Sequence, residues 1–166
     1  MALTQTEFNR LVDEYGPTLY RIAYRMVGDG HVAEDIVQET FRSAWKGRQR
    51  YEPGRGDRAW LATILRRRVV DHWRRKKPID TIGGDAVYEI VIHDPEPLAD
   101  ELSGQLQEGL EKLAKPLRET LLLVVVGELT HQEVADMLGI PLGTVLSRVS
   151  RARTRLRQHM IDLATT

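Results

Sequence analysis

Residues 129–156 read LTHQEVADMLGIPLGTVLSRVSRARTRL, and this stretch changes character halfway along. Its first part has the apolar spacing of an amphipathic helix, and Thr130 and Glu133 can form a capping box at the start of that helix. Gly139 can adopt the left-handed conformation that ends a helix, and Pro141 prevents the helix from continuing. A second, arginine-rich helix follows. Two short helices joined in this way predict a helix-turn-helix.

The second of these helices concentrates basic side chains. No acidic residue occurs between Met137 and Ile161, so salt bridges along the helix do not account for its arginines. In a helix-turn-helix the N-terminal part of the second helix enters the major groove, where arginine can read guanine through two hydrogen bonds. The simpler alternative is a solvated basic helix face. The residues that we expect to contact DNA are Thr144, Ser147, Arg148, Arg151, Arg153 and Arg155.

The chain has 166 residues and a net charge of zero, but its charge is distributed unevenly. Residues 1–78 hold 16 basic and 10 acidic residues, residues 79–110 hold eight acidic and no basic residues, and residues 111–166 hold 8 basic and 6 acidic residues. The average charge therefore does not exclude nucleic-acid binding. The absence of cysteine excludes disulfides and thiolate metal sites. The five histidines are scattered without a metal-site spacing, so we expect no metal and no cofactor.

Apolar residues recur at three- and four-residue spacing along most of the chain, which predicts an all-α protein. Gly16-Pro17 is expected to bend or break the first helix, Asp57 to cap the third, and Pro78 to stop it. Residues 79–97 have only acidic charge and no helical period, which predicts a flexible acidic linker between two small helical domains, residues 1–78 and 98–166. The expected helices cover about residues 6–27, 33–45, 57–77, 98–113, 117–126, 130–138 and 143–161.

Three stretches of the chain then resemble a bacterial RNA polymerase sigma factor of the extracytoplasmic-function type. AEDIVQETFRSAW and WLATILRRRVVDHWRR match the second region of this family, and HQEVADMLGIPLGTVLSRVSRARTRLR matches its fourth. The resemblance covers about residues 8–75 and 111–159. It implies a region 2 helical bundle, a region 4 helix-turn-helix that recognises the minus-thirty-five promoter element, and a role in promoter-specific transcription initiation without enzymatic activity.

The resemblance also gives a role to the N-terminal half. The polar face of the second helix is similar to the surface that docks on the clamp coiled-coil of the polymerase β′ subunit; its members are Asp35, Gln38, Glu39 and Arg42. The third helix and the loop before it are similar to the part that captures the minus-ten element as a single strand, which suits aromatic and guanidinium planes that stack on bases. The expected contacts are Tyr51, Arg55, Arg66, Arg67, Trp73, Arg74 and Arg75. Trp60 is expected in the core, whereas Trp73 is compatible with either a core position or a contact with DNA.

The implied partners are core RNA polymerase, through the β′ clamp and the β flap, promoter DNA, and an anti-sigma factor. The free protein is expected to be monomeric. It is also expected to be cytoplasmic, because the N-terminus lacks a signal peptide and the longest apolar stretch, residues 121–126, is too short for a membrane span. The acidic linker either mimics phosphate charge inside the polymerase or acts as a simple tether.

Three positions depart from the family pattern, among them Ser150, which replaces a bulkier residue between the recognition-helix arginines. Leu146 stands where the family usually has a basic residue; it cannot hold a phosphate but can touch a thymine methyl group. Arg67 stands where an asparagine is usual. A stand-alone helix-turn-helix regulator is the alternative function, although it leaves the acidic face of the second helix without a purpose. An enzyme is the third possibility, but the GGD motif at residues 83–85 lacks the α/β sheet of a cyclase, and no phosphate-binding glycine loop is present.

Overall fold

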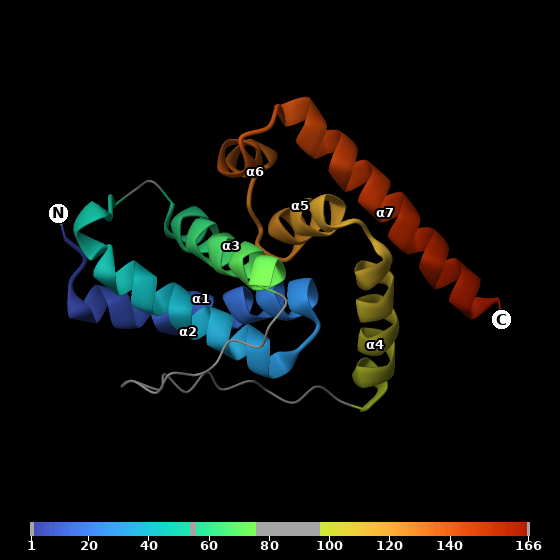
Figure 1. Cartoon of the computed structure of the whole chain (residues 1–166), viewed down its shortest axis with the longest axis horizontal. Coiled ribbons are helices and arrows are strands. Elements are labelled where there is room, and N and C mark those ends of the chain that lie inside the picture. Colours follow the sequence, from blue (N-terminus) through green and yellow to red (C-terminus); the bar gives the residue numbers. More distant parts are fainter. Residues whose placement is uncertain (1, 54–55, 76–96, 166) are drawn as a thin grey trace. The chain divides into compact units, whose positions relative to one another are not determined.

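The computed structural model describes residues 2–53, 56–75 and 97–165, whose regular structure is entirely helical (Figure 1). The chain divides into two compact units, residues 1–92 and 93–166. The all-α prediction is confirmed. Arg55, Pro78 and the predicted linker up to Glu96 lie outside the described residues. The elements are α1 (Gln5–Val27), α2 (Gly30–Lys46), the 3-10 helix η1 (Arg48–Arg50), α3 (Asp57–Arg75), α4 (Pro97–Lys112), α5 (Lys115–Val125), α6 (His131–Leu138) and α7 (Leu142–Ala164).

The N-terminal unit is a bundle in which α1, α2 and α3 each pack against the other two. Short polar side chains define where its first two helices begin. Thr4 and Glu7 form a capping box at α1, and the Asp29 carboxylate accepts hydrogen bonds from the backbone N–H groups of His31 and Val32 in the first turn of α2. The bundle core is made of large apolar side chains with almost no exposed surface, among them Phe8, Leu11, Ile22, Ile36, Phe41, Leu61 and Leu65.

The predicted break in α1 is absent, because the helix continues through Pro17. Pro17 has no N–H to donate to the carbonyl of Asp13, but both residues are exposed, so water can satisfy that carbonyl. Leu19 and Ile22 follow directly and are 2% and 1% exposed. Their burial against α2 and α3 outweighs the local cost of the proline.

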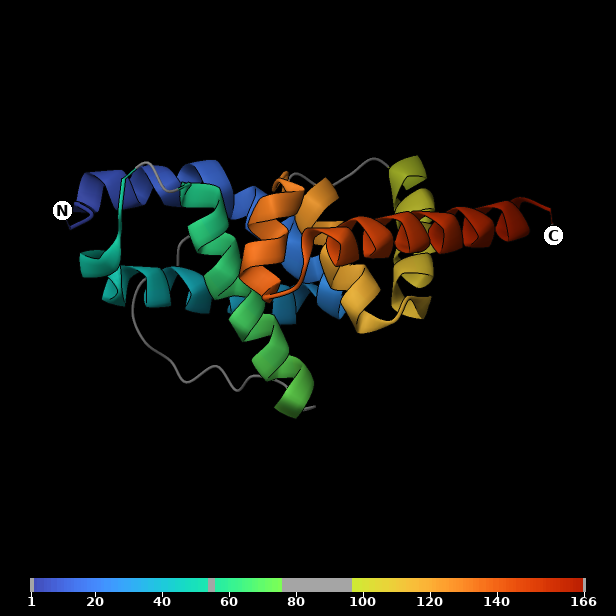
Figure 2. The same cartoon turned by 90° about the horizontal axis from the view of Figure 1, so that it is seen from above.

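Within the C-terminal unit, α7 packs against α4, α5 and α6, and Figure 2 shows α4 crossing α7. The two helices approach closely at Gly109 of α4. A Cβ atom at this position would lie 2.7 Å from Cδ1 of Leu156 and 2.8 Å from Cδ2 of His159, both on α7. Only glycine allows this approach without a shift of these two side chains. The contact lies on the C-terminal half of α7.

Arg118 of α5 holds the end of α4. Its side chain is buried, its Nε donates to the carbonyl of Leu110 at 2.7 Å, and its Nη2 donates to the carbonyls of Glu111 at 2.8 Å and Leu113 at 3.2 Å. The last carbonyls of a helix have no partner within the helix and attract positive charge. Burial lowers the pKa of Arg118, yet a guanidinium stays protonated in proteins.

Replacing this buried guanidinium should destabilise the C-terminal unit. In Arg118→Met the carbonyls of Glu111 and Leu113 lose the guanidinium donor and that of Leu110 keeps only its bond from the Leu113 amide, so we expect unfolding to require about 2–3 kcal/mol less free energy. Urea denaturation followed by circular dichroism measures the loss. Lys112→Met is the matched control, because Lys112 is exposed and its pairing with Glu108 at 3.8 Å is worth roughly 0.5 kcal/mol. Equal losses in the two variants would contradict the role of Arg118 as a helix cap.

Candidate functional site

The turn between α6 and α7 has the geometry of a helix-turn-helix. Thr130 and Glu133 form the capping box predicted for the start of α6, with both hydrogen bonds at 3.0 Å. Gly139 ends α6 in the left-handed conformation with φ of 66°, and the next amide donates to the carbonyl of Ala135 at 3.1 Å. Pro141 then precedes the first turn of α7. The turn residue Ile140 is therefore bonded to α6, and the carbonyl of Pro141 accepts hydrogen bonds from the amides of Thr144 and Val145 in the first turn of α7.

The residues predicted to contact DNA divide between two stripes along α7. Its buried side consists of Val145, Val149 and Ala152. Successive residues in a helix are about 100° apart, so spacings of four, three and four residues define one stripe. This first stripe contains Thr144, Arg148, Arg151 and Arg155, with Ser147 beside it. The second stripe, on the other side of the solvent-facing arc, contains Leu142, Leu146, Arg153 and Arg157, so Arg153 is not grouped with the other predicted residues.

None of the arginines of α7 is engaged in an ion pair with a residue that the structure describes. Arg151, Arg153 and Arg155 are exposed, whereas Arg148 is half-buried. Nε of Arg151 makes one long contact of 3.5 Å with the carbonyl of Ser147. The guanidinium groups therefore remain available for phosphates or base edges.

The basic residues predicted on α3 do not share one face. Arg67 and Arg74, seven residues apart, are exposed and lie opposite the buried side of the helix. Arg66 and the half-buried Trp73 lie on one flank, and Arg75 lies on the opposite flank. A single strand that contacts all of them has to cross the outer face of α3.

Tyr51, predicted to stack on an extruded base, is instead packed inside the N-terminal unit. The side chain is 8% exposed, its ring centroid lies 5.2 Å from that of the half-buried Trp60, and its hydroxyl donates to the Asp57 carboxylate at 2.5 Å. Asp57 is the first residue of α3 and not the predicted N-cap. In this structure Tyr51 anchors the loop before α3 and has no free ring face for a base.

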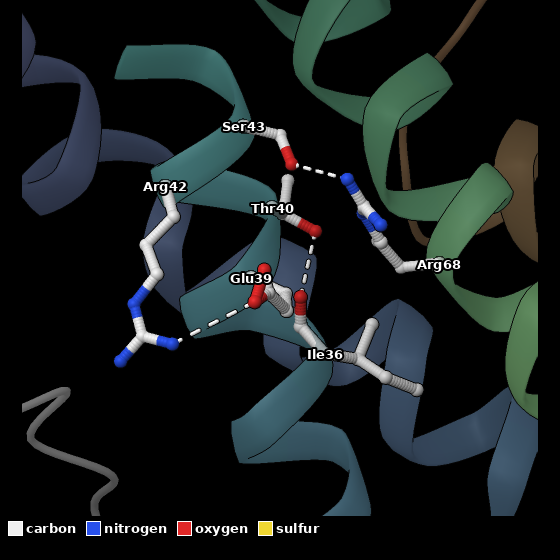
Figure 3. Close-up of polar contacts among 6 residues, drawn as sticks. All are labelled: Ile36, Glu39, Thr40, Arg42, Ser43 and Arg68. Carbon is white, nitrogen blue, oxygen red and sulfur yellow. Dashed lines mark hydrogen bonds and ion pairs between the residues drawn. The ribbon is translucent and has the colours of Figure 1, made fainter. Parts of the chain in front are cut away.

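The four residues predicted to dock on the polymerase share the solvent-facing side of α2. Asp35, Gln38, Glu39 and Arg42 are half-buried and lie opposite the buried Val37. Glu39 and Arg42 form an ion pair at 3.6 Å (Figure 3). Partial burial raises the pKa of Asp35, and nearby positive charge of His31 and Arg42 opposes this shift. The stripe thus presents two carboxylates beside one guanidinium.

The structure also reveals a basic hollow that the sequence analysis did not predict. It has a volume of about 520 Å³ and is lined by Ser43, Lys46, Gly47, Gln49, Arg50 and Arg68. Nη2 of Arg68 on α3 donates to Oγ of Ser43 on α2 at 2.6 Å (Figure 3), and its Nη1 lies 3.9 Å from the Asp71 carboxylate. The cluster of basic residues at 46–50 was the available sequence signal, but the position of Arg68 depends on how α3 packs.

The described ranges contain neither a metal-binding cluster nor a membrane-spanning helix. No group of three or more histidine or acidic side chains there could hold a metal ion. No helix in the described part of the chain is both long enough and apolar enough to cross a bilayer.

Comparison with known protein families accounts for both units. Residues 11–79 match the model described as Sigma-70 region 2, and residues 103–156 match the model described as Sigma-70, region 4. The ECF RNA polymerase sigma factor SigW of Bacillus subtilis is 33% identical over 96% of this chain and 91% of its own length. The chain therefore belongs to the extracytoplasmic-function group of sigma-70-family sigma factors. Members of this family are transcription initiation factors.

Two solved structures are similar to the chain over most of its length. CnrH, in complex with the cytosolic domain of CnrY, has a TM-score of 0.73 and 26% identity over 96% of this chain and 90% of that chain. The sigma factor RpoE from Bartonella quintana, in complex with the anti-sigma factor NepR, has a TM-score of 0.77 and 28% identity over 93% of this chain and 97% of that chain.

The bond between Tyr51 and Asp57 should give the N-terminal unit a pH-dependent stability. This bond, together with burial of the ring and the negative charge of Asp57, raises the pKa of Tyr51 from its usual 10.0 to about 12. Its contribution is therefore fully present below pH 10 and lost as the pH rises through about 12. We expect Tyr51→Phe to lower the free energy of unfolding by about 1 kcal/mol at pH 7, and this difference to shrink above pH 10.

Chemical denaturation at several pH values measures this difference. Tyr24→Phe is the control, because the Tyr24 hydroxyl makes no hydrogen bond with a described residue and its loss should change stability by less than about 0.5 kcal/mol. A pH-independent difference between wild type and Tyr51→Phe would rule out the carboxylate bond as its cause.

Proposed function

We propose that this sigma factor uses three surfaces, one each on α2, α3 and α7. In this proposal region 2 covers residues 1–78, the linker residues 79–97 and region 4 residues 98–166. The chain forms and breaks no bonds itself and acts in the cytoplasm as a subunit of RNA polymerase. The observation that carries this proposal is that the acidic and the basic surfaces lie on different helices. The solvent-facing side of α2 presents carboxylates, whereas the solvent-facing sides of α3 and α7 present arginines.

The α2 stripe is the proposed docking surface for the β′ clamp coiled-coil. Asp35 and Glu39 are one helical turn apart, so both can face one helix of the partner. Arg42 limits the net negative charge of the stripe through its ion pair with Glu39. This arrangement suits a partner that presents both basic and acidic side chains, because complementary charge fixes the register of docking.

The outer face of α3 is the proposed path of the melted minus-ten strand. Arg67 and Arg74 lie outermost, and Arg66, Arg75 and Trp73 flank them. Positive side chains attract the phosphates of the DNA backbone, and a base can stack on an indole or guanidinium plane. Tyr51 supports this path indirectly by holding the preceding loop onto α3.

The solvent-facing arc of α7 is the proposed reader of the minus-thirty-five element. Of the predicted contact residues, Ser147 and Arg151 lie nearest the centre of the arc, where base edges are reached, and Arg153 and Arg155 lie nearer the phosphates on either side. The β flap of the polymerase would hold the C-terminal unit over this element. We further propose that an anti-sigma factor inhibits the free, monomeric protein, a proposal supported by the anti-sigma partner of the similar RpoE structure.

Run-off transcription tests the proposed function. Purified bacterial core polymerase is incubated with a pool of random promoter sequences, with and without the protein, and the RNA ends are sequenced. We expect transcripts that start a fixed distance from an enriched two-part motif. If the protein binds DNA in that mixture but no defined starts appear, even with core polymerase from its own source, a stand-alone regulator becomes the better assignment.

Reversing the charge of the α2 stripe should separate polymerase binding from DNA binding. Asp35→Arg with Glu39→Arg places positive charge where the carboxylates docked, so we expect roughly tenfold or greater weakening of core-polymerase binding. DNA affinity should not fall. Fluorescence anisotropy of the labelled protein measures the first quantity, and labelled DNA measures the second.

The matched control is Asp13→Arg with Glu14→Arg, which makes the same charge change on two exposed carboxylates of α1. Polymerase binding that survives in the α2 double variant would exclude this docking surface. A similar loss in the α1 control would reduce the effect to one of net charge.

A further inference from the structure

Large apolar side chains are seldom exposed among the residues that the structure describes. The four exposed ones are Val125, Leu142, Leu146 and Ile161, whose exposed fractions are 50%, 41%, 49% and 48%. Two of them, Leu142 and Leu146, lie one helical turn apart at the start of α7, the helix with the unpaired arginines. A partner of this helix should therefore offer apolar groups to the two leucines and negative charge to the arginines.

The sequence of the second stripe of α7 limits what that partner can be. Leu142 and Leu146 occupy its N-terminal part, and Arg153 and Arg157 continue it toward the C-terminus. Neither arginine is engaged by a described carboxylate. The matching surface is therefore apolar where it meets the tip of the helix and anionic farther along.

The major groove of DNA has this combination. Its walls carry phosphates, and each thymine places a 5-methyl group on its floor, where apolar side chains make contact. Side chains on a helix tilt toward its N-terminus, so Leu142 and Leu146 point toward the end of α7 that enters the groove. Ser147 lies beside Leu146 in sequence and on the same exposed arc, so the apolar pair borders the proposed base-reading residues.

We infer that Leu146, with Leu142 beside it, takes up a thymine 5-methyl group in the minus-thirty-five element and so determines part of the promoter specificity. This inference rests on the proposed function, because it requires α7 to lie in the major groove. The apolar pair selects a methyl group where a basic side chain would bind phosphate or guanine. The expected preference is for a thymine at one or two fixed positions.

Deoxyuridine substitution tests this inference directly. A promoter is first selected from the random pool with the holoenzyme of core polymerase and this protein. Each thymine of its minus-thirty-five element, on either strand, is then replaced singly by deoxyuridine, which removes only the 5-methyl group. We expect holoenzyme affinity for labelled DNA to fall about fourfold at one or two positions, the factor that corresponds to burying one methyl group.

Protein variants identify which side chain senses the methyl group. In Leu146→Ala the fourfold effect of deoxyuridine should disappear, and in Leu142→Ala it should diminish. Ile161→Ala is the matched control, because Ile161 has similar exposure on the same helix but lies near its C-terminal end. The control should keep the full deoxyuridine effect.

The outcomes separate this inference from the proposed function. Defined transcript starts together with full tolerance of deoxyuridine at every position would overturn the methyl contact and leave the sigma-factor function standing. The absence of any defined start would overturn both. If deoxyuridine has no effect and Leu146→Ala weakens core-polymerase binding, the pair contacts protein and the inference is likewise overturned.

Discussion

The three-residue reversal between α6 and α7 is the constraint on which the proposed DNA-reading surface depends. Gly139 provides a left-handed backbone, and the next amide closes back onto Ala135. Pro141 then cannot extend α6, and the first amides of α7 bond to its carbonyl. Because these are backbone features, the direction of α7 does not depend on the identity of its exposed side chains. Burial of Val145 and Val149 then fixes the rotation of the helix about its axis.

Much of this fold follows from local rules. The capping box at Thr130 and Glu133 and the glycine stop at residue 139 were predictable, because both depend on residues close together in the chain. The break predicted as one alternative at Pro17 does not occur, because tertiary burial of the residues after it outweighs a local preference. Arg118 looked like any charged residue of an amphipathic helix. Its role as a cap depends on where α4 ends in space, which no local pattern contains.

The candidate site was predictable to a different extent on each helix. On α2 and α7 the apolar stripe is clear, so the solvent-facing residues follow from helical periodicity. On α3 three consecutive arginines, residues 66–68, point about 100° apart, and only the packing of the bundle decides that Arg67 faces outward and Arg68 reaches Ser43. Tyr51 could not be assigned from sequence, because a tyrosine in a basic loop is equally compatible with base stacking and with an anchoring hydrogen bond to Asp57.

The close approach of α4 to α7 at Gly109 has an evolutionary consequence. It joins the C-terminal half of α7 to the body of its unit at Leu156 and His159, while the N-terminal half is held only along one side. Substitutions on the solvent-facing side of that half leave the buried Val145, Val149 and Ala152 in place and break no hydrogen bond to a described side chain. Promoter preference can therefore diverge between duplicated copies of such a gene with little penalty in folding, whereas a larger residue at Gly109 requires the side chains of Leu156 and His159 to shift.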